Sequence, residues 1–382
     1  MMNLLLVSTQ DYLHHPIPSR HHNIFERLAA WHDIHVPHFH VSHGPARNTL
    51  LHVHEATRFP VKTPVLHYTL NAPHHYRVMR EIIRDHDIDI VVGAHVLAGT
   101  AMVRAARQAN IPVVFDLKDW FPDSAAAYAT NPVIKRVVHD GVLAVTRYNL
   151  KHSDVITTVS PGLVAKLHGY GYEAELITNG VNTDLFRPRD GSRVREALGI
   201  DPDAFVLGFA GAVERWYALD EVIRALPRIV ERHPNVELLI VGDALFTGYR
   251  ETLHRLAATC GIASRVHFTG AVAYPNLPEY IAAMDLGLIP LAPPQWVDIA
   301  LPNKYFEYSA CEKPILTTPI PDVLALGGDH LRVYRNRAEF IQQVDTAIRD
   351  PVRCTLDMTD HDWQRKATAF ETIFARVLGG RR

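Results

Sequence analysis

The sequence predicts an α/β protein with two doubly wound domains that face a central cleft, and three observations support this fold class. Short apolar runs typical of buried parallel strands alternate with segments of helical character along the chain. These runs fall into two successive sets, as in a protein with two sheets. The chain has 382 residues, which suits two domains because one domain usually has about 100–200 residues.

The composition is that of an ordinary globular protein, and it excludes several functional classes. Apolar residues make up 47% of the chain and charged residues 21%, and the net charge of −2 gives no basic field for nucleic acid. Three scattered cysteines without a CxxC pair favour a reducing compartment. No apolar run reaches about 18 residues and Met1-Met2 leads directly into a strand, so we expect a cytoplasmic protein without a transmembrane helix or signal peptide.

The first part of the chain contains four apolar runs of the kind that parallel strands bury. We expect strands at 3–8, 88–95, 111–116 and 155–160, and helices at 19–30, 76–85, 99–110 and 132–152. Three further short runs, at 34–36, 50–53 and 65–68, are broken by Pro and Gly and indicate strands joined by variable loops. The first strand is not followed by GxGxxG, which argues against a dinucleotide-binding dehydrogenase.

Two features of this part admit more than one interpretation. Ser19 and Arg20 begin the helix after the first strand. Arg20 either binds a phosphate group of a substrate, whether that substrate donates or accepts the transferred group, or is a solvated residue at the helix end. The chain also has 24 histidines, many of them between residues 14 and 75, but no HExxH or Cys/His spacing appears. We therefore predict no metal site and interpret these residues as neutral or partly protonated histidines on strands and loops.

Polar residues at strand ends are the candidates for chemistry in the first domain. In doubly wound folds, function collects at the carboxyl ends of the strands. His95 ends the strand expected at 88–95, and Lys118 and Asp119 follow the strand expected at 111–116. These three residues are therefore our candidates for the catalytic set.

The helix at 133–151 interleaves basic and apolar residues. The basic residues are Lys135, Arg136, Arg147 and Lys151, and the apolar residues are Val133, Val137, Val142, Val145 and Leu150. One interpretation is a core-facing apolar stripe with a solvated basic side. The other is an amphipathic face that rests on an anionic membrane surface, which would make the protein peripheral on the cytoplasmic membrane face.

The second part of the chain contains a helix start that suits an anionic ligand. We expect strands at 206–211, 236–243, 266–272, 286–291 and 315–316, and helices at 219–232, 277–284, 304–311 and 362–378. Asn303 can cap the helix at 304–311, Lys304 lies at its start, and Glu307 follows one turn later on the same face. Lys304 suits a diphosphate and Glu307 two ribose hydroxyls, because a helix start favours anions. The alternative is two surface charges on an ordinary helix.

Two motifs in this part resemble a known enzyme family. The segment 302–316, PNKYFEYSACEKPIL, resembles the PxKxxEYxxxxKP signature of glycosyltransferase family 4 and its GT-B relatives. The segment 177–188, ITNGVNTDLFRP, resembles the junction between the two GT-B domains. The resemblance implies a GT-B fold of two Rossmann-like domains, in which Glu307 holds the donor ribose and the preceding loop surrounds the donor sugar and phosphates.

The resemblance assigns further residues to the donor. Gly211 matches a family glycine that lets the donor phosphate approach the backbone, and Arg215 matches a cation that clamps the phosphate. The sequence departs from the family at 217–219, where YAL replaces the usual KG. Val272 matches a segment whose backbone lies beside the nucleobase.

Other family positions are altered in this sequence. The first of two family glutamates, which grips the donor sugar, falls on Ile299, so Asp298 or backbone N–H groups would hold the sugar instead. In the first domain, Lys118 stands where the family usually has His, whereas Asp119 matches. Asp119 is therefore the first candidate for contacting the acceptor hydroxyl, and His95 is the second.

The resemblance implies a retaining glycosyltransferase that moves a sugar from a UDP- or GDP-linked donor to a glycan or lipid-linked acceptor, without an obligatory metal or cofactor. Residues 1–185, with 362–382 packing back on them, would bind the acceptor, and residues 186–361 would bind the donor. Arg215, Lys304 and helix N-termini would stabilise the leaving diphosphate. The alternatives are other GT-B chemistry, such as an epimerase or phosphorylase, and a non-catalytic sugar-nucleotide-binding protein.

Overall fold

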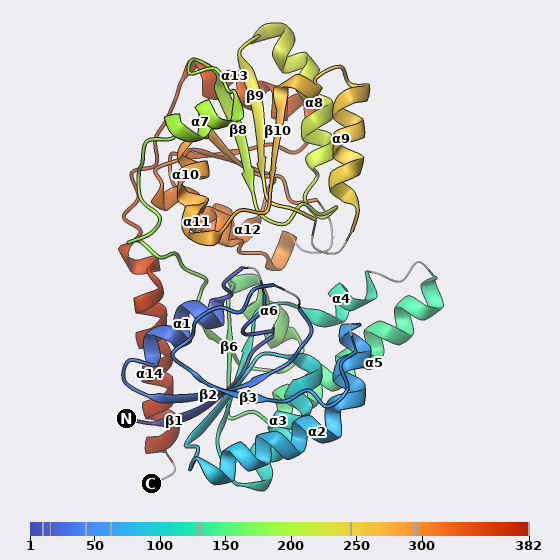
Figure 1. The fold of residues 1–382 in the computed structure, drawn as a ribbon, viewed down its shortest axis with the longest axis vertical. Coiled ribbons are helices and arrows are strands. Elements are labelled where there is room, and N and C mark those ends of the chain that lie inside the picture. Colours follow the sequence, from blue (N-terminus) through green and yellow to red (C-terminus); the bar gives the residue numbers. More distant parts are fainter. Residues whose placement is uncertain are drawn as a thin grey trace. The chain divides into compact units, whose positions relative to one another are not determined.

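The protein contains two compact units (Figure 1). The computed structural model describes residues 1–9, 11–15, 17–42, 44–61, 63–127, 131–244, 247–292 and 297–380. Unit 1 consists of Met1–Thr178 and Trp363–Arg382, and unit 2 consists of Asn179–Asp362. This division lies before the boundary expected at residue 185, because the chain after Thr178 pairs within unit 2: the Val181 N–H donates to the His361 carbonyl over 2.9 Å.

Unit 1 is built on a parallel sheet with the strand order β3-β2-β1-β4-β5-β6-β7. The strands are β1 (Asn3–Val7), β2 (Asp33–His38), β3 (His52–Glu55), β4 (Ile90–Gly93), β5 (Val113–Leu117), β6 (Val155–Thr158) and β7 (Glu175–Leu176). The central strands β4 and β5 are buried along their whole length, which explains their sequences, apolar apart from Asp116 in β5. The strand order reverses between β1 and β4, and such a reversal is where open α/β sheets bind ligands.

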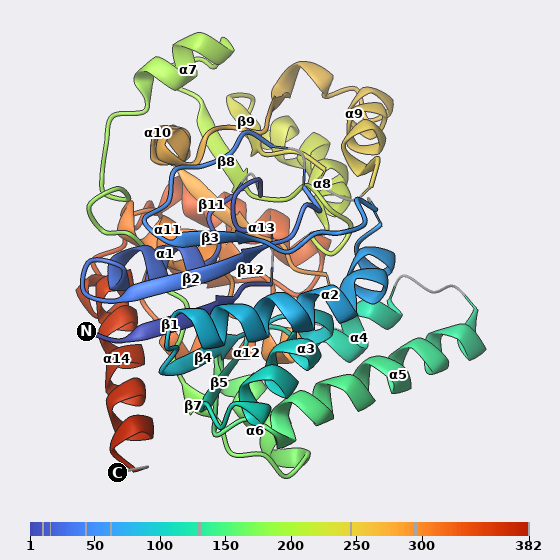
Figure 2. The same cartoon turned by 60° about the horizontal axis from the view of Figure 1, so that its bottom comes forward.

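Helices cover both faces of this sheet (Figures 1 and 2). They are α1 (Arg20–Leu28), α2 (Pro64–Asp85), α3 (Val96–Gln108), α4 (Phe121–Ala126), α5 (Pro132–Lys151), α6 (Pro161–Gly169) and α14 (Trp363–Gly379). Helices α1 and α14 pack against each other on one side, and α2, α3 and α5 pack together on the other. The C-terminal helix belongs to unit 1 because Trp363, Phe370 and Phe374 are buried in one cluster with Phe25. Burying a side chain of this kind contributes about 1.5–3 kcal/mol.

Helix α2 corrects one of the sequence expectations. The run Val65–Tyr68, which we expected to be a strand, forms the first turn of α2, and the helix continues through Pro73. Its buried face carries His67, Asn71 and His75, which are four residues apart as a helix requires. The helical period was hidden because polar residues occupy the buried positions that an apolar pattern would normally mark.

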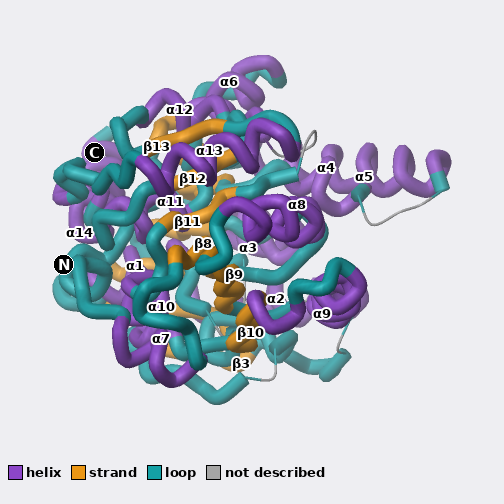
Figure 3. The backbone as a smooth tube through the Cα atoms, turned by 90° about the horizontal axis from the view of Figure 1, so that it is seen from above, coloured by secondary structure: helices purple, strands orange, loops and turns teal. Residues whose placement is uncertain are grey.

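Unit 2 is built on a second parallel sheet with the strand order β10-β9-β8-β11-β12-β13 (Figure 3). Its strands are β8 (Phe205–Ala210), β9 (Val236–Val241), β10 (Val266–Gly270), β11 (Leu286–Ile289), β12 (Ile315–Thr317) and β13 (Leu331–Val333). Its α-helices are α7 (Ser192–Leu198), α8 (Leu219–Arg232), α9 (Tyr249–Thr259), α10 (Leu277–Ala282), α11 (Asn303–Ala310), α12 (Pro321–Leu326) and α13 (Arg337–Arg349). Helices α8 and α9 lie on one side of the sheet and α10 and α11 on the other.

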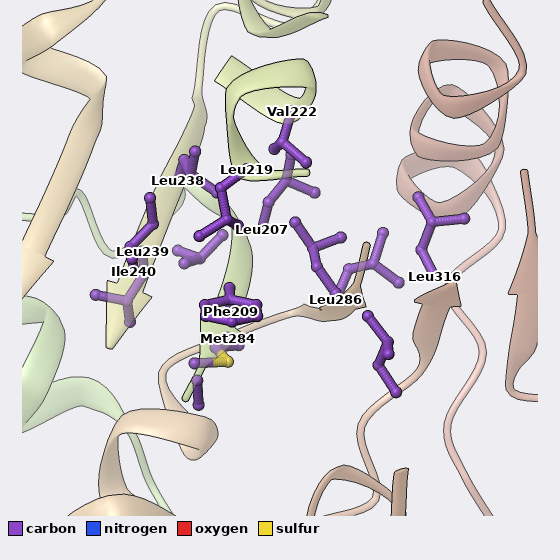
Figure 4. Close-up of a cluster of buried hydrophobic side chains, with 14 of the residues drawn as sticks. Leu207, Phe209, Leu219, Val222, Leu238, Leu239, Ile240, Met284, Leu286 and Leu316 are labelled. Carbon is purple, nitrogen blue, oxygen red and sulfur yellow. The ribbon is translucent and has the colours of Figure 1, made fainter. Parts of the chain in front are cut away.

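The core of unit 2 lies between these layers (Figure 4). Leu207 and Phe209 of β8 pack with Leu238 and Ile240 of β9 in one buried cluster, together with residues of α8, β11 and β12. Each of these four side chains is fully buried. The core fixes β8 and β9, whose carboxyl ends carry the loops described next. Among the described helices of both units, none combines the length and the apolar character that a membrane span requires.

Candidate functional site

The strongest candidate site lies in unit 2 at the point where its strand order reverses. This reversal falls between β8 and β11. Gly211 directly follows β8, and its N–H donates to the Val241 carbonyl at the end of β9 over 2.8 Å. Gly211 has φ +145°, a conformation that side chains other than glycine rarely adopt. Its Cα therefore faces the helix that follows β11 without a side chain in between.

Lys304 occupies the space that Gly211 leaves free. A Cβ atom at Gly211 would lie 2.4 Å from the Lys304 Nζ. The ammonium donates to the Tyr217 hydroxyl over 2.9 Å and lies 5.0 Å from the centre of the Phe209 ring and 4.2 Å from that of Tyr217. Lys304 is only 8% exposed, and no carboxylate of the described residues forms an ion pair with it. Such a buried charge without a counter-ion is costly unless an anion binds.

Glu307 lies one turn further along α11 and is 9% exposed. Its Oε1 accepts a hydrogen bond from the Tyr274 hydroxyl over 3.5 Å, the limit of such a contact. Burial raises the pKa of Glu307 to about 7, although the positive charge of Lys304 and the Tyr274 hydroxyl oppose the shift. The carboxyl is therefore poised between its neutral and charged forms near neutral pH.

Tyr308 fixes α11 in this position. Its hydroxyl accepts a hydrogen bond from the Ala210 N–H, at the end of β8, over 2.8 Å. Its ring packs on Gly287 of β11, where a Cβ would lie 2.6 Å from the ring. The EY pair of the sequence motif therefore combines one residue that faces the candidate site with one that anchors the helix to the sheet.

Asn303, which we also predicted to bind the donor, is not the N-cap of α11. The N-cap of α11 is Pro302, and Asn303 is the first residue of the helix. Its Oδ1 is buried and has no hydrogen-bond partner among the described residues. The cap prediction was wrong by one position, because a proline at the cap already sets the extended backbone that precedes a helix.

The remaining donor candidates lie on loops of unit 2. Arg215 is exposed, its guanidinium lies 5.1 Å from the centre of the Tyr249 ring, and it forms no ion pair with the described residues. Val272 is half-buried after β10. Asp298 is exposed in the 3-10 helix η3 (Val297–Ile299), and the loop residues 293–296 before it lie outside the described part of the chain. Three of the predicted residues therefore lie on two elements of unit 2: Gly211 at the end of β8, and Lys304 and Glu307 on α11.

Sequence reasoning missed the aromatic side chains that hold Lys304. Tyr217 appeared only as part of a departure from the family motif, yet its hydroxyl accepts from the Lys304 ammonium. Phe209 was assigned only to a buried strand, yet its ring faces the same ammonium. The sequence signal was the replacement of the family KG by YAL at 217–219, which brings Tyr217 in at this departure from the motif.

In unit 1, the strand-end candidates differ in what they contact. Asp119 is exposed and Lys118 half-buried after β5. Desolvation by surrounding protein raises the pKa of Asp119 and lowers the pKa of Lys118, and the attraction between the two charges opposes both shifts. His95 instead caps α3, with its Nδ1 accepting from the Ala98 N–H over 3.1 Å. Burial lowers the pKa of His95 to about 3, so this imidazole is neutral.

Arg20 is a correction to the phosphate-binding prediction. Its guanidinium is 4% exposed, with Nε 2.9 Å and Nη2 3.3 Å from the Asp116 carboxylate, and Nη1 donates to the Thr178 carbonyl over 2.9 Å. Asp116 also accepts from Thr157 over 2.8 Å. Arg20 is therefore a structural residue that ties α1 to β5. Ser19 is the N-cap of α1, and its Oγ lies 2.9 Å from the His22 Nδ1.

A depression in unit 2 lies away from these residues. It has a volume of about 990 Å³ and is lined by α7 and neighbouring residues, among them Arg189, Arg195 and Arg265. None of the residues predicted to bind the donor lines it. Arg195 is already paired with Asp285 over 2.7 Å. We therefore place the candidate site at Gly211, Lys304 and Glu307, where the buried charge lies.

Comparison with known families identifies both halves of the chain. Residues 19–185 match the family described as Glycosyltransferase Family 4, and residues 204–350 match Glycosyl transferases group 1. The chain belongs to the GT-B glycosyltransferases of the family 4 type. In this GT-B glycosyltransferase, Lys304 and Glu307 lie within the group 1 segment, and Asp119 lies within the family 4 segment.

Curated relatives match parts of this GT-B chain. The GDP-mannose-dependent alpha-(1-6)-phosphatidylinositol monomannoside mannosyltransferase of Mycobacterium tuberculosis is 31% identical over 219 residues, which are 56% of this chain and 52% of the relative. The D-inositol 3-phosphate glycosyltransferase of Streptomyces bingchenggensis is 25% identical over 234 residues, 56% of this chain and 50% of the relative. The chain thus spans about half the length of these curated relatives.

Solved structures of similar fold cover the whole GT-B chain. Sucrose-phosphate synthase from Thermosynechococcus elongatus aligns with a TM-score of 0.81 at 15% identity, covering 100% of both chains. HepE from Anabaena in complex with UDP-glucose aligns with a TM-score of 0.71 at 19% identity, also covering 100% of both. These likenesses confirm the predicted fold class of two α/β domains, each with its own parallel sheet.

Proposed function

We propose that this protein transfers a sugar from a UDP- or GDP-linked donor to a glycan or lipid-linked acceptor, with retention of the anomeric configuration. The observation that carries the donor half is the ammonium of Lys304, which is buried, lacks an ionic partner among the described residues and lies against the bare Cα of Gly211. A diphosphate that approaches this glycine would supply the missing negative charge.

The chemistry that the residues support is charge stabilisation. As the bond between the anomeric carbon and the diphosphate breaks, negative charge grows on the leaving group, and Lys304 and the exposed Arg215 are the cations assigned to it. Glu307 accepts hydrogen bonds from the ribose in this proposal. No obligatory metal or further cofactor is part of it, because these side chains supply the positive charge.

The nucleotide and the acceptor are proposed at the level of chemical class. A mycobacterial relative is named for GDP-mannose, and the HepE structure contains UDP-glucose, so both nucleotides are candidates. That relative is also named for a phosphatidylinositol mannoside, which supports a glycan or lipid-linked acceptor. We assign acceptor binding to unit 1, with Asp119 beside Lys118 as the acceptor contact, and donor binding to unit 2.

The test measures nucleotide binding and sugar transfer in two glycine-to-alanine variants, one in the candidate site and one outside it. UDP, GDP, ADP, TDP and their sugars are screened for a rise in melting temperature, which a ligand specific to the folded protein produces by mass action. Gly211→Ala is expected to lower the affinity for the best ligand at least about tenfold, because the new Cβ displaces the Lys304 ammonium and a backbone at φ +145° costs on the order of 1–3 kcal/mol for alanine. Isothermal titration calorimetry measures the affinity of each variant.

The matched control is Gly248→Ala, also in unit 2. Gly248 has φ −83°, and a Cβ there would meet nothing closer than 3.5 Å, so its affinity should equal that of the wild type. A chain that binds no nucleotide would refute the donor site. A chain that binds a sugar nucleotide but releases nucleotide without any acceptor, or never turns it over, would favour the epimerase or binding-protein alternatives over transfer.

We further propose that α5 docks on an anionic membrane surface. Its first turns are solvent-exposed although they are apolar: Val133 is 70% exposed, Ile134 56% and Val137 67%. Lys135 and Arg136 are exposed between them. The core-facing interpretation of this stripe is therefore wrong for the start of the helix, and apolar side chains flanked by cations suit a lipid headgroup region.

Vesicle sedimentation tests this proposal. The protein is expected to sediment with vesicles that contain an anionic phospholipid and to be released by high salt, since the Debye length falls from about 10 Å at 0.1 M to about 3 Å at 1 M. Val137→Asp should abolish sedimentation, whereas Leu356→Asp, at an exposed leucine of unit 2, should not. Equal sedimentation of both variants, or none for the wild type, would reject the membrane surface.

A further inference from the structure

Three histidines from three separate elements converge at the edge of the sheet in unit 1. His35 comes from β2, His54 from the edge strand β3, and His86 is the C-cap of α2. One ring nitrogen of each lies within 4.8 Å of one nitrogen of both others. The His35 Nδ1 and the His54 Nε2 are 2.8 Å apart, and the His35 ring stacks on that of His86 with centres 4.1 Å apart.

The fold forces these rings together. Strands β2 and β3 are parallel neighbours, and their register places His35 opposite His52, two residues before His54 (Figure 2). The sharp end of α2 then brings His86 against the His35 ring. His35 is 5% exposed, so its imidazole has little access to water. In the neutral rings, either the His35 Nδ1 or the His54 Nε2 donates a hydrogen bond to the other, and a metal ion that bound between them would replace that proton.

We propose that His35, His54 and His86 bind a divalent transition-metal ion, with Zn²⁺ the best match. Zinc takes three histidine ligands at about 2.0–2.1 Å in a tetrahedral arrangement and leaves the fourth position to water or a carboxylate. Tetrahedral ligand nitrogens are then roughly 3.3 Å apart, compared with 2.8 Å between the His35 and His54 nitrogens and the 4.8 Å within which the nitrogens of all three residues lie.

The surroundings of the cluster suit a cation. His54 and His86 line a shallow depression of about 370 Å³ whose wall also carries Glu81 and Asp85. Glu81 is paired with Arg77 over 3.8 Å and Asp85 with Arg84 over 2.6 Å, and the depression gives a hydrated ion a path to His54 and His86.

A second histidine cluster has a different character. His14, His38 and His40 also bring one nitrogen each within 4.8 Å. Here the His38 Nε2 lies 3.2 Å from the Asp11 carboxylate and the His40 Nε2 lies 2.6 Å from that of Glu55. These carboxylates raise the pKa of His38, which favours a charged network of ion pairs over metal ligation. This cluster therefore serves as the internal control.

The role that the geometry gives the ion is structural. His35 lies early in β2, His86 precedes β4, and β3 is the last strand of the sheet. The site is thus near the strand-entry end, away from the carboxyl ends that carry His95 and Asp119. An ion bound there would tie the edge strand to α2, and its binding free energy would add to the stability of unit 1.

The test uses untagged full-length protein stripped with a chelator and then titrated with Zn²⁺ alone. We expect one tight site per chain, a higher melting temperature with Zn²⁺, and the intense visible absorption of tetrahedral Co²⁺ when cobalt replaces zinc. His54→Gln and His86→Gln should each weaken the tight site more than about 100-fold, because even second-shell changes cost 10–100-fold. His40→Gln and the exposed His168→Gln should leave it unchanged.

Two outcomes would overturn the proposal. One is the absence of a stoichiometric site that survives competition with a weak chelator. The other is a tight site that persists in both His54→Gln and His86→Gln. Circular dichroism of the stripped proteins separates loss of metal from loss of fold, and His86→Gln, at a half-buried helix end, decides the question if His54→Gln fails to fold.

Discussion

Glu307→Ala is expected to weaken the binding of a sugar nucleotide on the order of 100-fold, since two hydrogen bonds to a charged acceptor are lost and each is worth about 1.5–3 kcal/mol. The carboxylate is 9% exposed, so water replaces it poorly. Isothermal titration calorimetry measures this loss. Glu251→Ala, at an exposed glutamate of α9 in the same unit, is the matched control and should bind like the wild type.

The pH dependence of binding gives a sharper form of this prediction. The pKa of Glu307 is raised to about 7, and the ribose hydroxyls donate to its ionised form. Below pH 7 binding must first remove the proton, so affinity should fall about tenfold per pH unit, whereas above pH 8 it should be constant. UDP-glucose or GDP-mannose is the proper ligand, because both of its phosphates are esterified and do not titrate in this range.

Glu307→Gln separates the two states of the carboxyl. It cannot ionise, so its weak binding should not vary between pH 6 and 8. The substitution weakens ligand binding, but it should raise the folding stability of the empty protein at alkaline pH. The folded protein holds a proton on Glu307 between pH 4.5 and about 7 that the unfolded chain releases, so stability declines as pH rises through this window.

Without ligand at pH 8, Glu307→Gln should therefore be more stable than the wild type, by up to about 3 kcal/mol. A variant that is more stable when empty yet binds poorly is the signature of a buried acid retained for a ligand. Wild-type affinity in Glu307→Ala, or the same pH slope in Glu307→Gln, would remove Glu307 from the donor site.

The placement of Lys304 and Glu307 on one face of one helix was predictable because its determinants are local. Lys304 and Glu307 are three residues apart on one helix, so their shared face follows from the helical period alone. The aromatic setting of Lys304 was not predictable in the same way. Phe209 and Tyr217 lie 95 and 87 residues before Lys304 and reach it only because β8 lies beside β11.

The error about Arg20 was caused by a partner that is distant in sequence. Arg20 looked like an exposed helix-end cation, but Asp116 lies 96 residues away and takes up its guanidinium. The three histidines of the proposed metal site would be missed by a search for metal motifs for a similar reason, because His35, His54 and His86 come from two strands and a helix end. Motif spacing reveals ligands that lie on the same helix, strand or loop. It does not reveal ligands that come from separate strands and helices, which a parallel sheet brings together.

Acidification is expected to unfold unit 1 before unit 2. Burial lowers the pKa of His22, His75 and His95 to about 3, and all three belong to unit 1. A histidine with a lowered folded-state pKa loses stability as pH falls below its unfolded value of 6.5. At pH 5 each would oppose folding by about 2 kcal/mol and the three by about 6, which is comparable with the whole stability of a domain.

Unit 2 should respond differently to the same change of pH. There, protonation of Glu307 adds stability as pH falls from about 7 to 4.5. In unit 1 the raised pKa of His38 also adds stability as the pH falls, but the three buried histidines with lowered pKa values remove more. Hydrogen exchange read by mass spectrometry assigns the opening to each unit. Simultaneous exchange of both units, or earlier exchange of unit 2, would contradict the prediction.

His75→Leu tests the cause directly. His75 is fully buried, and neither of its ring nitrogens has a hydrogen-bond partner among the described residues, so leucine forfeits no hydrogen bond there. The variant should resist acid by about 2 kcal/mol at pH 5 relative to the wild type, while the exposed His168→Leu should not. Equal acid midpoints for both variants would mean that protonation of this imidazole does not drive the transition. If His75→Leu were equally stabilising at pH 8, the gain in stability would come from packing. A gain that comes from avoiding protonation disappears above the pKa of histidine in the unfolded chain.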